Sequence, residues 1–313
     1  MTIGLGTAAI GRPLYINIKG SVSEGEFDKA EFSRKGKSVL TAAYNNGVRH
    51  FDTAPGYGMA EQILLEWIAE FQPKDIKIST KWGYTYVANF DPTATVHEVK
   101  EHSLSKLNEQ WEVSKQFLPY LNIYQIHSAT LDSGVLTNEA VLARLYELKK
   151  EYKINIGLST SGDNQNEIIE KAIAIEVNNE PLFDSFQVTY NVFDQNLLKL
   201  SNTLKGKKVI IKEALANGRV FPNEKFPNYK STYHLLEALA VKYKVGVDAV
   251  ALRFCVDTLK PFSVLSGASV INQLVSNLDV SKFELSLKDI DELKSLAVSP
   301  KAYWEERKAL DWN

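Results

Sequence analysis

The stretch LNIYQIHSATLDSGVLTNEAVLARLYELKKEYKINIGLS, residues 121–159, contains the unit from which the fold follows. It begins with an apolar run (121–127), continues through a helical pattern (138–152) and ends in a second apolar run (154–159). Both runs are nearly continuous rather than alternating, which is typical of parallel strands buried on both faces. The order strand, helix, strand therefore predicts a parallel βαβ unit with a right-handed crossover.

The same pattern repeats along the chain. Further strand-like runs occupy residues 49–53, 76–81, 185–190, 208–212 and 262–265. Helical patterns occupy residues 38–46, 60–71, 93–108, 164–175, 195–204, 233–243, 247–257, 272–279 and 286–296, the last with Ser286 as a predicted N-cap. With one more strand near Lys37 or just before the first helix, this makes about eight βα units.

An open doubly wound sheet and a closed barrel both fit repeated βα units. About eight evenly spaced units without a reversal favour a (β/α)8 TIM barrel, and no linker divides the chain, so we expect one domain over residues 1–313. We expect three additions to it: an N-terminal hairpin (3–7 with 14–19), a long segment at 214–231 and a C-terminal tail after Ser299 that lies over the barrel.

The motif GLGTAA (4–9) fits the loose dinucleotide pattern G-x-G-x-x-G/A, but no helical period follows it. A turn or hairpin at the barrel bottom is therefore the better interpretation.

Composition excludes several function classes. The formal net charge is −2, which argues against nucleic acid or an anionic membrane as the main partner. Cys255 is the single cysteine, as a reducing compartment favours, and the start MTIGLGTAAIG lacks the basic region of a secretory signal. We expect a cytoplasmic protein that acts on a small molecule, with a monomer slightly favoured.

Four polar residues follow or end neighbouring strand-like runs. Asp52 and Tyr57 lie in HFDTAPGYG (50–58), Lys81 in STKWG and His127 in YQIHS. Each has a structural interpretation: a turn or cap for Asp52, a solvated loop lysine for Lys81, and a satisfied core histidine for His127. In a barrel, however, the carboxyl ends of the strands converge on the active-site face. Together the four residues therefore predict a functional site.

This set suits the reduction of a carbonyl group. A tyrosine is a poor acid at neutral pH unless a neighbouring ammonium lowers its pKa. Lys81 would supply that ammonium, Asp52 would hold it in place, and His127 would orient a carbonyl oxygen. The hydride must come from a cofactor, because no side chain supplies one.

The segments HFDTAPGYG, STKWG and YQIHS, in this order, resemble the aldo-keto reductases. These are (α/β)8 barrels that use NAD(P)H to reduce aldehydes and ketones. The resemblance covers nearly the whole chain. It implies that Tyr57 is the general acid and that Lys81, His127 and Asp52 complete a catalytic tetrad; it implies no metal.

The resemblance also implies cofactor contacts. GLSTSG, FQVTYN, IIKEALANGR and SGASVINQLVSNL resemble the ends of strands five to eight in that family. The residues implied are Ser159, Gln187, Tyr190, Ala214, Leu215, Asn217, Gly218, Arg219, Gly267, Ala268, Ser269, Gln273 and Asn277. Residues 266–277 contain no Lys or Arg, and Gln273 stands where Arg is common. Ser269 and Arg219 remain as phosphate ligands, so we expect NADPH, with NADH as the alternative.

Two tryptophans, Trp82 and Trp304, are expected at the substrate pocket, although Trp304 and Trp312 of the tail could instead seal loops onto the barrel. Tyr84, Tyr86 and Trp312 are further aromatic residues expected near the mouth.

Two other functions stay open for this set of residues. One is a nucleotide-binding barrel that serves as a regulatory or scaffold subunit, and the other is an isomerase or dehydratase with the same acid–base set.

Overall fold

The computed structural model describes residues 2–14, 28–91 and 93–310. Its main feature is a closed barrel in which the strand order is β1-β12-β11-β10-β7-β6-β3-β2. All neighbouring barrel strands are parallel. The barrel strands are β1 (Ile3–Gly6), β2 (His50–Asp52), β3 (Lys77–Trp82), β6 (Leu121–Ala129), β7 (Asn155–Thr160), β10 (Ser185–Thr189), β11 (Lys208–Lys212) and β12 (Ser263–Ser266). The predicted TIM barrel is confirmed.

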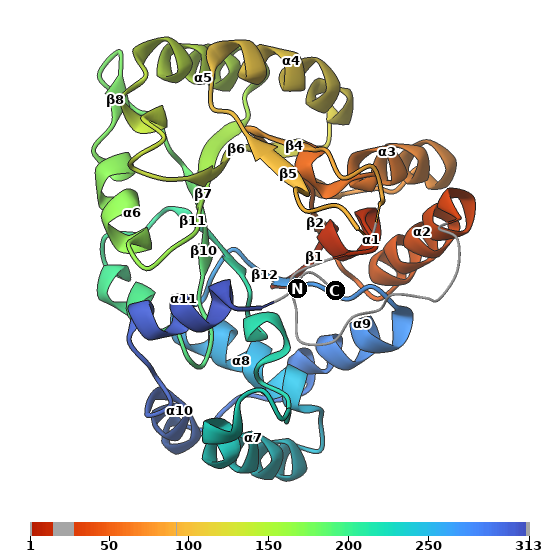
Figure 1. The fold of residues 1–313 in the computed structure, drawn as a ribbon, viewed down its shortest axis with the longest axis vertical. Coiled ribbons are helices and arrows are strands. Elements are labelled where there is room, and N and C mark those ends of the chain that lie inside the picture. Colours follow the sequence, from red (N-terminus) through yellow and green to blue (C-terminus); the bar gives the residue numbers. More distant parts are fainter. Residues whose placement is uncertain (1, 15–27, 92, 311–313) are drawn as a thin grey trace.

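Helices form a ring outside the strands (Figure 1). They are α2 (Lys29–Asn45), α3 (Ala60–Phe71), α4 (Leu104–Ser114), α5 (Glu139–Tyr152), α6 (Gln165–Ile173), α7 (Lys230–Tyr243), α8 (Val247–Leu259), α9 (Ile271–Leu278) and α10 (Leu287–Lys294), while α11 (Pro300–Lys308) lies at the barrel mouth (Figure 1). The core lies between strands and helices, and every residue of β10 is buried. Burial on both faces explains why the strands read as continuous apolar runs. At α10 the predicted cap is confirmed, because the Ser286 hydroxyl accepts from the Asp289 amide.

The first strand was assigned wrongly. Residues Ile3–Gly6 do not begin a hairpin but form barrel strand β1, which pairs with β12 and β2. A short helix, α1 (Ala8–Gly11), follows it, so GLGTAA lies at the end of a strand and not at the barrel bottom. The remaining part of the predicted hairpin, from residue 15 on, lies outside the described residues. No strand forms near Lys37, which lies within α2.

Two predicted helices were also wrong in part. Residues 93–108 contain β5 (Glu98–Lys100), which pairs with β4 (Tyr84–Tyr86) in an antiparallel hairpin before α4 begins. The N-cap Ser103 sets the later start, because its hydroxyl accepts from the Lys106 amide. Residues 195–204 form only a short 3-10 turn, η4 (Asn196–Leu200).

The C-terminal tail docks at the barrel mouth as expected. Tyr303 and Arg307 of α11 both hydrogen bond to Glu213, which directly follows β11. Within residues 2–14, 28–91 and 93–310, no helix has the length and apolar character needed to cross a membrane.

Candidate active site

The loop after β2 places Tyr57 above the strand ends. Asp52 ends β2, and the 3-10 turn η1 (Pro55–Tyr57) begins with a proline, which suits the first helical position. Gly58 follows at φ +62°, where a Cβ would lie 2.5 Å from the Gly11 carbonyl oxygen. This close approach to α1 explains why the turn ends in glycine. The turn chemistry and the site geometry therefore belong to the same loop.

Asp52 is the centre of a buried polar network. Its Oδ2 accepts a hydrogen bond from Lys81 Nζ at 2.5 Å, and its Oδ1 accepts from Ser79 Oγ at 2.6 Å and Gln187 Nε2 at 2.8 Å. Lys81 Nζ also donates to the Thr53 carbonyl at 3.0 Å. The Lys81 and Asp52 side chains are 0% and 2% exposed, so this ion pair is shielded from water. Its geometry holds the Lys81 ammonium in one position.

Tyr57 packs beside that ammonium. Lys81 Nζ lies 4.7 Å from the centre of the Tyr57 ring, and the His127 ring lies edge-on at 5.5 Å. Burial raises the pKa of Tyr57 well above its ordinary value, Asp52 raises it further, and Arg12 opposes the rise. This is opposite to the lowering that we expected from Lys81, because burial of the phenol is the largest contribution to its pKa. The phenol therefore keeps its proton at neutral pH.

His127 reaches the site through an irregularity in β6. The pairing of β6 with β7 shifts between Ile126 and Ala129, and Ser128 adopts φ +47°. Two contacts hold this bulge: His102 Nε2 donates to the His127 carbonyl at 2.9 Å, and the Ser128 amide donates to Ser159 Oγ at 2.8 Å. Such bulges re-aim side chains next to functional sites.

The imidazole of His127 is neutral. Burial lowers its pKa well below the ordinary value, and the cations of Lys81, Arg12 and Lys212 lower it further. Its Nδ1 is buried without a hydrogen-bond partner in the described chain. Tyr84 of the β4–β5 hairpin packs on the ring at 4.6 Å. A neutral imidazole of this kind can donate one hydrogen bond to a ligand.

A cavity of about 880 Å³ begins at these residues and runs to the start of α9. Asp52 and Tyr57 line one part of it. Most of the predicted cofactor residues also line it, namely Gln187, Ala214, Leu215, Asn217, Gly218, Gly267, Ala268, Ser269, Gln273 and Asn277. The structure thus brings Asp52, Tyr57 and the distal loop residues onto one continuous surface, whereas Lys81 and His127 lie behind it and do not line the cavity.

The distal wall of this cavity, which consists of Asp248 and the lining residues within 265–277, is polar and carries no lysine or arginine. Asn277 donates to Asp248 Oδ2 at 2.6 Å and accepts from Ser266 Oγ at 2.6 Å. Gln273 Oε1 accepts from the Ser269 amide at 3.1 Å. Asp248 is the acidic group on this wall, and sequence patterns did not single it out because it reads as an ordinary residue of the first turn of α8.

Three predicted cofactor residues do not line the cavity. Tyr190 follows β10 and faces outward: its ring stacks on Phe254 at 5.7 Å and its hydroxyl contacts Thr258 Oγ1. The Tyr190 side chain therefore does not face the cavity, because side chains of successive residues in a strand point to opposite faces. Ser159 is 1% exposed, and its hydroxyl accepts from the Ser128 amide.

Arg219 is committed to the tail. Its guanidinium is fully buried, donates to the Tyr303 carbonyl at 3.1 Å and pairs with Glu306 at 3.1 Å. We expected Arg219 to bind a cofactor phosphate, but in this structure its side chain does not extend across the cavity.

The two tryptophans that we expected at the substrate pocket lie in different places. Trp82 is fully buried and packs on His102, because Lys81 takes the inward direction at the end of β3. Trp304 is buried with its ring 5.7 Å from Lys212 Nζ, so it borders the site from α11. Trp312 lies outside the described residues.

Sequence reasoning missed two residues of the site. Arg12 donates to the Gly56 carbonyl and pairs with Glu98, and Lys212 lines the cavity.

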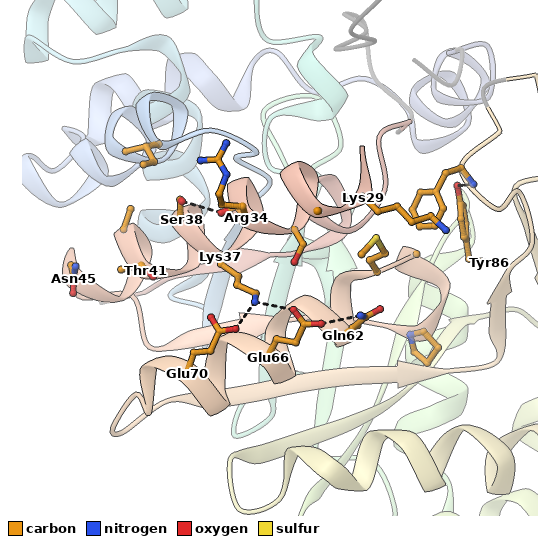
Figure 2. Close-up of a pocket in the computed structure, with 18 of the residues that line it drawn as sticks. Lys29, Arg34, Lys37, Ser38, Thr41, Asn45, Gln62, Glu66, Glu70 and Tyr86 are labelled. Atoms are coloured by element: carbon orange, nitrogen blue, oxygen red, sulfur yellow. Dashed lines mark hydrogen bonds and ion pairs between the residues drawn. The ribbon is translucent and has the colours of Figure 1, made fainter. Parts of the chain in front are cut away.

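A larger hollow of about 1290 Å³ lies elsewhere, between α2 and α3. Figure 2 shows Lys37 pointing toward Glu66 and Glu70 across it. Lys37 pairs with both carboxylates, and neither Tyr57 nor Asp52 lines this hollow. We therefore place the candidate site in the smaller cavity.

Comparison with known proteins identifies the family of the chain. A model of the Aldo/keto reductase family matches residues 2–298. The chain is 25% identical to the NADH-specific methylglyoxal reductase of Escherichia coli (strain K12), covering 94% of each chain. It is 24% identical to the aldo-keto reductase YhdN of Bacillus subtilis (strain 168), covering 94% of this chain and 89% of that protein.

Solved structures show the same fold. An aldo-keto reductase from Bacillus halodurans (holo form) superposes with a TM-score of 0.71 at 19% identity, covering 95% of this chain and 92% of that one. The glycerol dehydrogenase of Gluconobacter oxydans gives a TM-score of 0.71 at 22% identity, covering 94% and 90%. Because the family model spans almost the whole barrel, this chain belongs to the aldo/keto reductase family.

Proposed function

We propose that this protein reduces an aldehyde or ketone to an alcohol, with Tyr57 as the general acid and a nicotinamide dinucleotide as the reductant. The observation that supports it best is the shared cavity, in which Asp52, Tyr57 and Gln187 lie on the same surface as the loops after β11 and β12. Family membership supports an oxidoreductase. A bound nicotinamide dinucleotide would supply the hydride, which no side chain can supply.

The cavity fits such a cofactor. Its volume of about 880 Å³ is ample for a ligand of this size. A Cβ at Gly267 would meet no heavy atom within 4 Å, so the wall at the end of β12 is open. Gln187 and the loop residues 214–218 would hold one part of the cofactor, and Ser269, Gln273 and Asn277 at the start of α9 would hold the other. Exposed amides at a helix start also favour phosphate groups.

The side chains around Tyr57 divide the proton chemistry between them. Tyr57 donates its proton to the carbonyl oxygen, since burial keeps the phenol protonated. The Lys81 ammonium, fixed by Asp52, stabilises the phenolate that remains. Neutral His127 donates a hydrogen bond that orients the carbonyl oxygen. Together these groups balance the charge that develops on oxygen.

The preference for NADPH that we expected from the family resemblance stays a prediction. The charges of the distal wall favour the alternative, NADH. No described lining residue there carries a positive charge, while Asp248 carries a negative one. A 2′-phosphate would meet a carboxylate rather than a cation, whereas a ribose hydroxyl can donate to it. The NADH-specific relative from Escherichia coli is consistent with this choice.

The test is the Tyr57→Phe variant, assayed with both cofactors on a panel of aldehydes and ketones. We expect kcat to fall by about 10²- to 10⁴-fold, since general acid catalysis contributes that much. Cofactor affinity, measured by the change in protein fluorescence, should stay close to that of the unmodified protein. Tyr86→Phe is the matched control, because the Tyr86 hydroxyl accepts from the Phe90 amide in the hairpin loop.

Two results would contradict the proposal. If Tyr57→Phe reduces aldehydes as fast as the unmodified protein, the proton comes from another group. If neither dinucleotide binds at millimolar concentration, the reductase assignment fails. Tight binding without turnover of any carbonyl would instead favour a regulatory barrel.

A further inference from the structure

Two lysines lie at the barrel mouth, and their partners differ. Lys81 is paired directly with Asp52 at 2.5 Å and is fully buried. Lys212 ends β11 and lines the same cavity as Tyr57 and Gln187. Its Nζ donates to the Thr189 hydroxyl at 3.0 Å, a neutral acceptor. Its side chain is 19% exposed, so its charge reaches the space that a ligand would occupy.

The acidic group beside Lys212 is shared with the C-terminal tail. Glu213 Oε1 lies 3.9 Å from Lys212 Nζ, at the outer limit of an ion pair. The same oxygen accepts from Arg307 Nε and Nη2, each at 3.1 Å, and Oε2 accepts from the Tyr303 hydroxyl at 3.1 Å. Glu213 is therefore oriented toward α11. Among the described residues, Glu213 is the one carboxylate within ion-pair distance of Lys212, and it is shared with α11, while Asp194 acts on Lys212 from further away.

The charge of Lys212 is also poorly solvated and acts on the catalytic candidates. Burial lowers the pKa of Lys212, with Glu213 opposing and Arg307 and Lys81 adding to the effect. The same charge contributes to the low pKa of His127, whose ring packs edge-on against Tyr57. Lys212 thus lies within electrostatic range of the proposed reacting groups. An incoming anion would replace the solvation that the cation lacks.

We infer that Lys212 is a specificity-determining residue, which binds the carboxylate of a carbonyl substrate while the carbonyl group lies at Tyr57. This inference rests on the proposed function. It narrows the substrate class to aldehydes or ketones that carry a carboxylate group. Trp304 borders the same position, with its ring 5.7 Å from Lys212 Nζ, and adds a flat apolar surface next to the charge.

The experiment compares two probes of nearly equal shape, 4-carboxybenzaldehyde and its uncharged methyl ester, methyl 4-formylbenzoate. The measured quantity is the ratio of their kcat/KM values in the unmodified protein and in Lys212→Met, Lys212→Arg and Lys208→Met. Lys208 is the matched control: it begins the same strand, and its Nζ donates to Asn155 Oδ1 at 2.9 Å, away from the cavity lining.

We expect the unmodified protein to prefer the carboxylate by roughly 10- to 100-fold, the range of a hydrogen bond to a charged group. Lys212→Met should bring the ratio close to one, Lys212→Arg should keep most of it, and Lys208→Met should leave it unchanged. Equal kcat/KM for the two probes in the unmodified protein would overturn the inference. An equal loss for both probes in Lys212→Met would also overturn it, and so would a loss confined to cofactor affinity, which would assign Lys212 to a cofactor phosphate.

Failure of the proposed function gives a different result. In that case neither probe is reduced with NADH or NADPH by any variant. Binding of the two probes, measured by calorimetry on the cofactor-loaded protein carrying Tyr57→Phe, then tests Lys212 separately. Tighter binding of the carboxylate that Lys212→Met abolishes would retain the anion site, and equal binding of acid and ester would remove it.

Discussion

The two sides of the barrel mouth handle charge differently. On the β2–β3 side, Asp52 and Lys81 are paired at 2.5 Å and both side chains are almost fully buried. Every oxygen of the Asp52 carboxylate has a donor, since Ser79 and Gln187 bind the one that Lys81 leaves. On the β11–β12 side, most residues of the cavity wall are neutral, Asp248 is acidic, and Lys212 has its nearest carboxylate oxygen only at 3.9 Å.

This difference separates a fixed part of the site from an adaptable one. A buried, fully hydrogen-bonded ion pair cannot change one member without leaving the other unpaired. An open wall of glycine, alanine, serine and amide side chains can change its ligand preference through single substitutions. We therefore expect changes on the β2–β3 side to affect stability and chemistry together, and changes on the β11–β12 side to affect recognition alone.

The largest effect is expected for Lys81→Met. This change leaves the Asp52 carboxylate buried without its cation, which should lower the free energy of unfolding by about 3–5 kcal/mol. It should also reduce carbonyl reduction by about 10²-fold or more. Urea unfolding and steady-state kinetics measure the two effects. The double variant Asp52→Asn with Lys81→Met should regain most of the stability and none of the activity. If Lys81→Met alone were as stable as the unmodified protein, the ion pair of Asp52 and Lys81 would not contribute to stability as a unit.

A second effect concerns Glu61, which lies on α3 and bonds to Thr80 of β3 at 2.6 Å. Burial raises the pKa of Glu61 from 4.5 to about 7, against the opposing hydrogen bonds of Thr80 and Ser114. Because the folded state then binds this proton more tightly than the unfolded state, stability falls as pH rises from about 4.5 to about 7.

Glu61→Gln should remove that loss. We expect the variant to be about 2 kcal/mol more stable than the unmodified protein at pH 8.5 and of similar stability at pH 5. Thermal unfolding at the two pH values measures the difference. A gain of equal size at both pH values would rule out titration of Glu61 as its cause.

The smallest effect is expected on the distal wall. Gln273→Arg introduces a cation beside Ser269, where the described lining residues have none. It should raise the affinity for NADPH relative to NADH by about tenfold, as one charged hydrogen bond allows. Parallel fluorescence titrations measure the ratio, with Gln273→Met as the uncharged control. A strong preference of the unmodified protein for NADPH would contradict our view that the distal wall lacks a cation for the 2′-phosphate.

The fold was largely predictable because parallel barrel strands are buried on both faces and read as apolar runs. Strand β1 was assigned to an N-terminal hairpin instead of the barrel, because IGLG is short and glycine-rich and lacks the long apolar run of the other strands. The β4–β5 hairpin was missed because residues 93–108 were read as one helix, although the cap at Ser103 marks where α4 begins.

The positions of the site candidates were predictable to the extent that they end strands. Asp52 and Lys81 end or nearly end their strands, so barrel geometry alone brings them together. The direction of a side chain was harder to predict: Tyr190 lies one residue beyond β10 and faces Phe254 instead of the cavity. Arg219 could not be placed, because its partners Tyr303 and Glu306 come from the tail, far away in sequence.

The most direct test of the central claim is isotope transfer. The protein is given NADH that carries deuterium at the reactive C4 position, together with 4-carboxybenzaldehyde, and the alcohol is analysed by mass spectrometry and NMR. Our account predicts deuterium on the new carbinol carbon with the unmodified protein, and formation of that product slowed by about 10²-fold or more with Tyr57→Phe. An unlabelled alcohol, or equal rates for the two proteins, would contradict it.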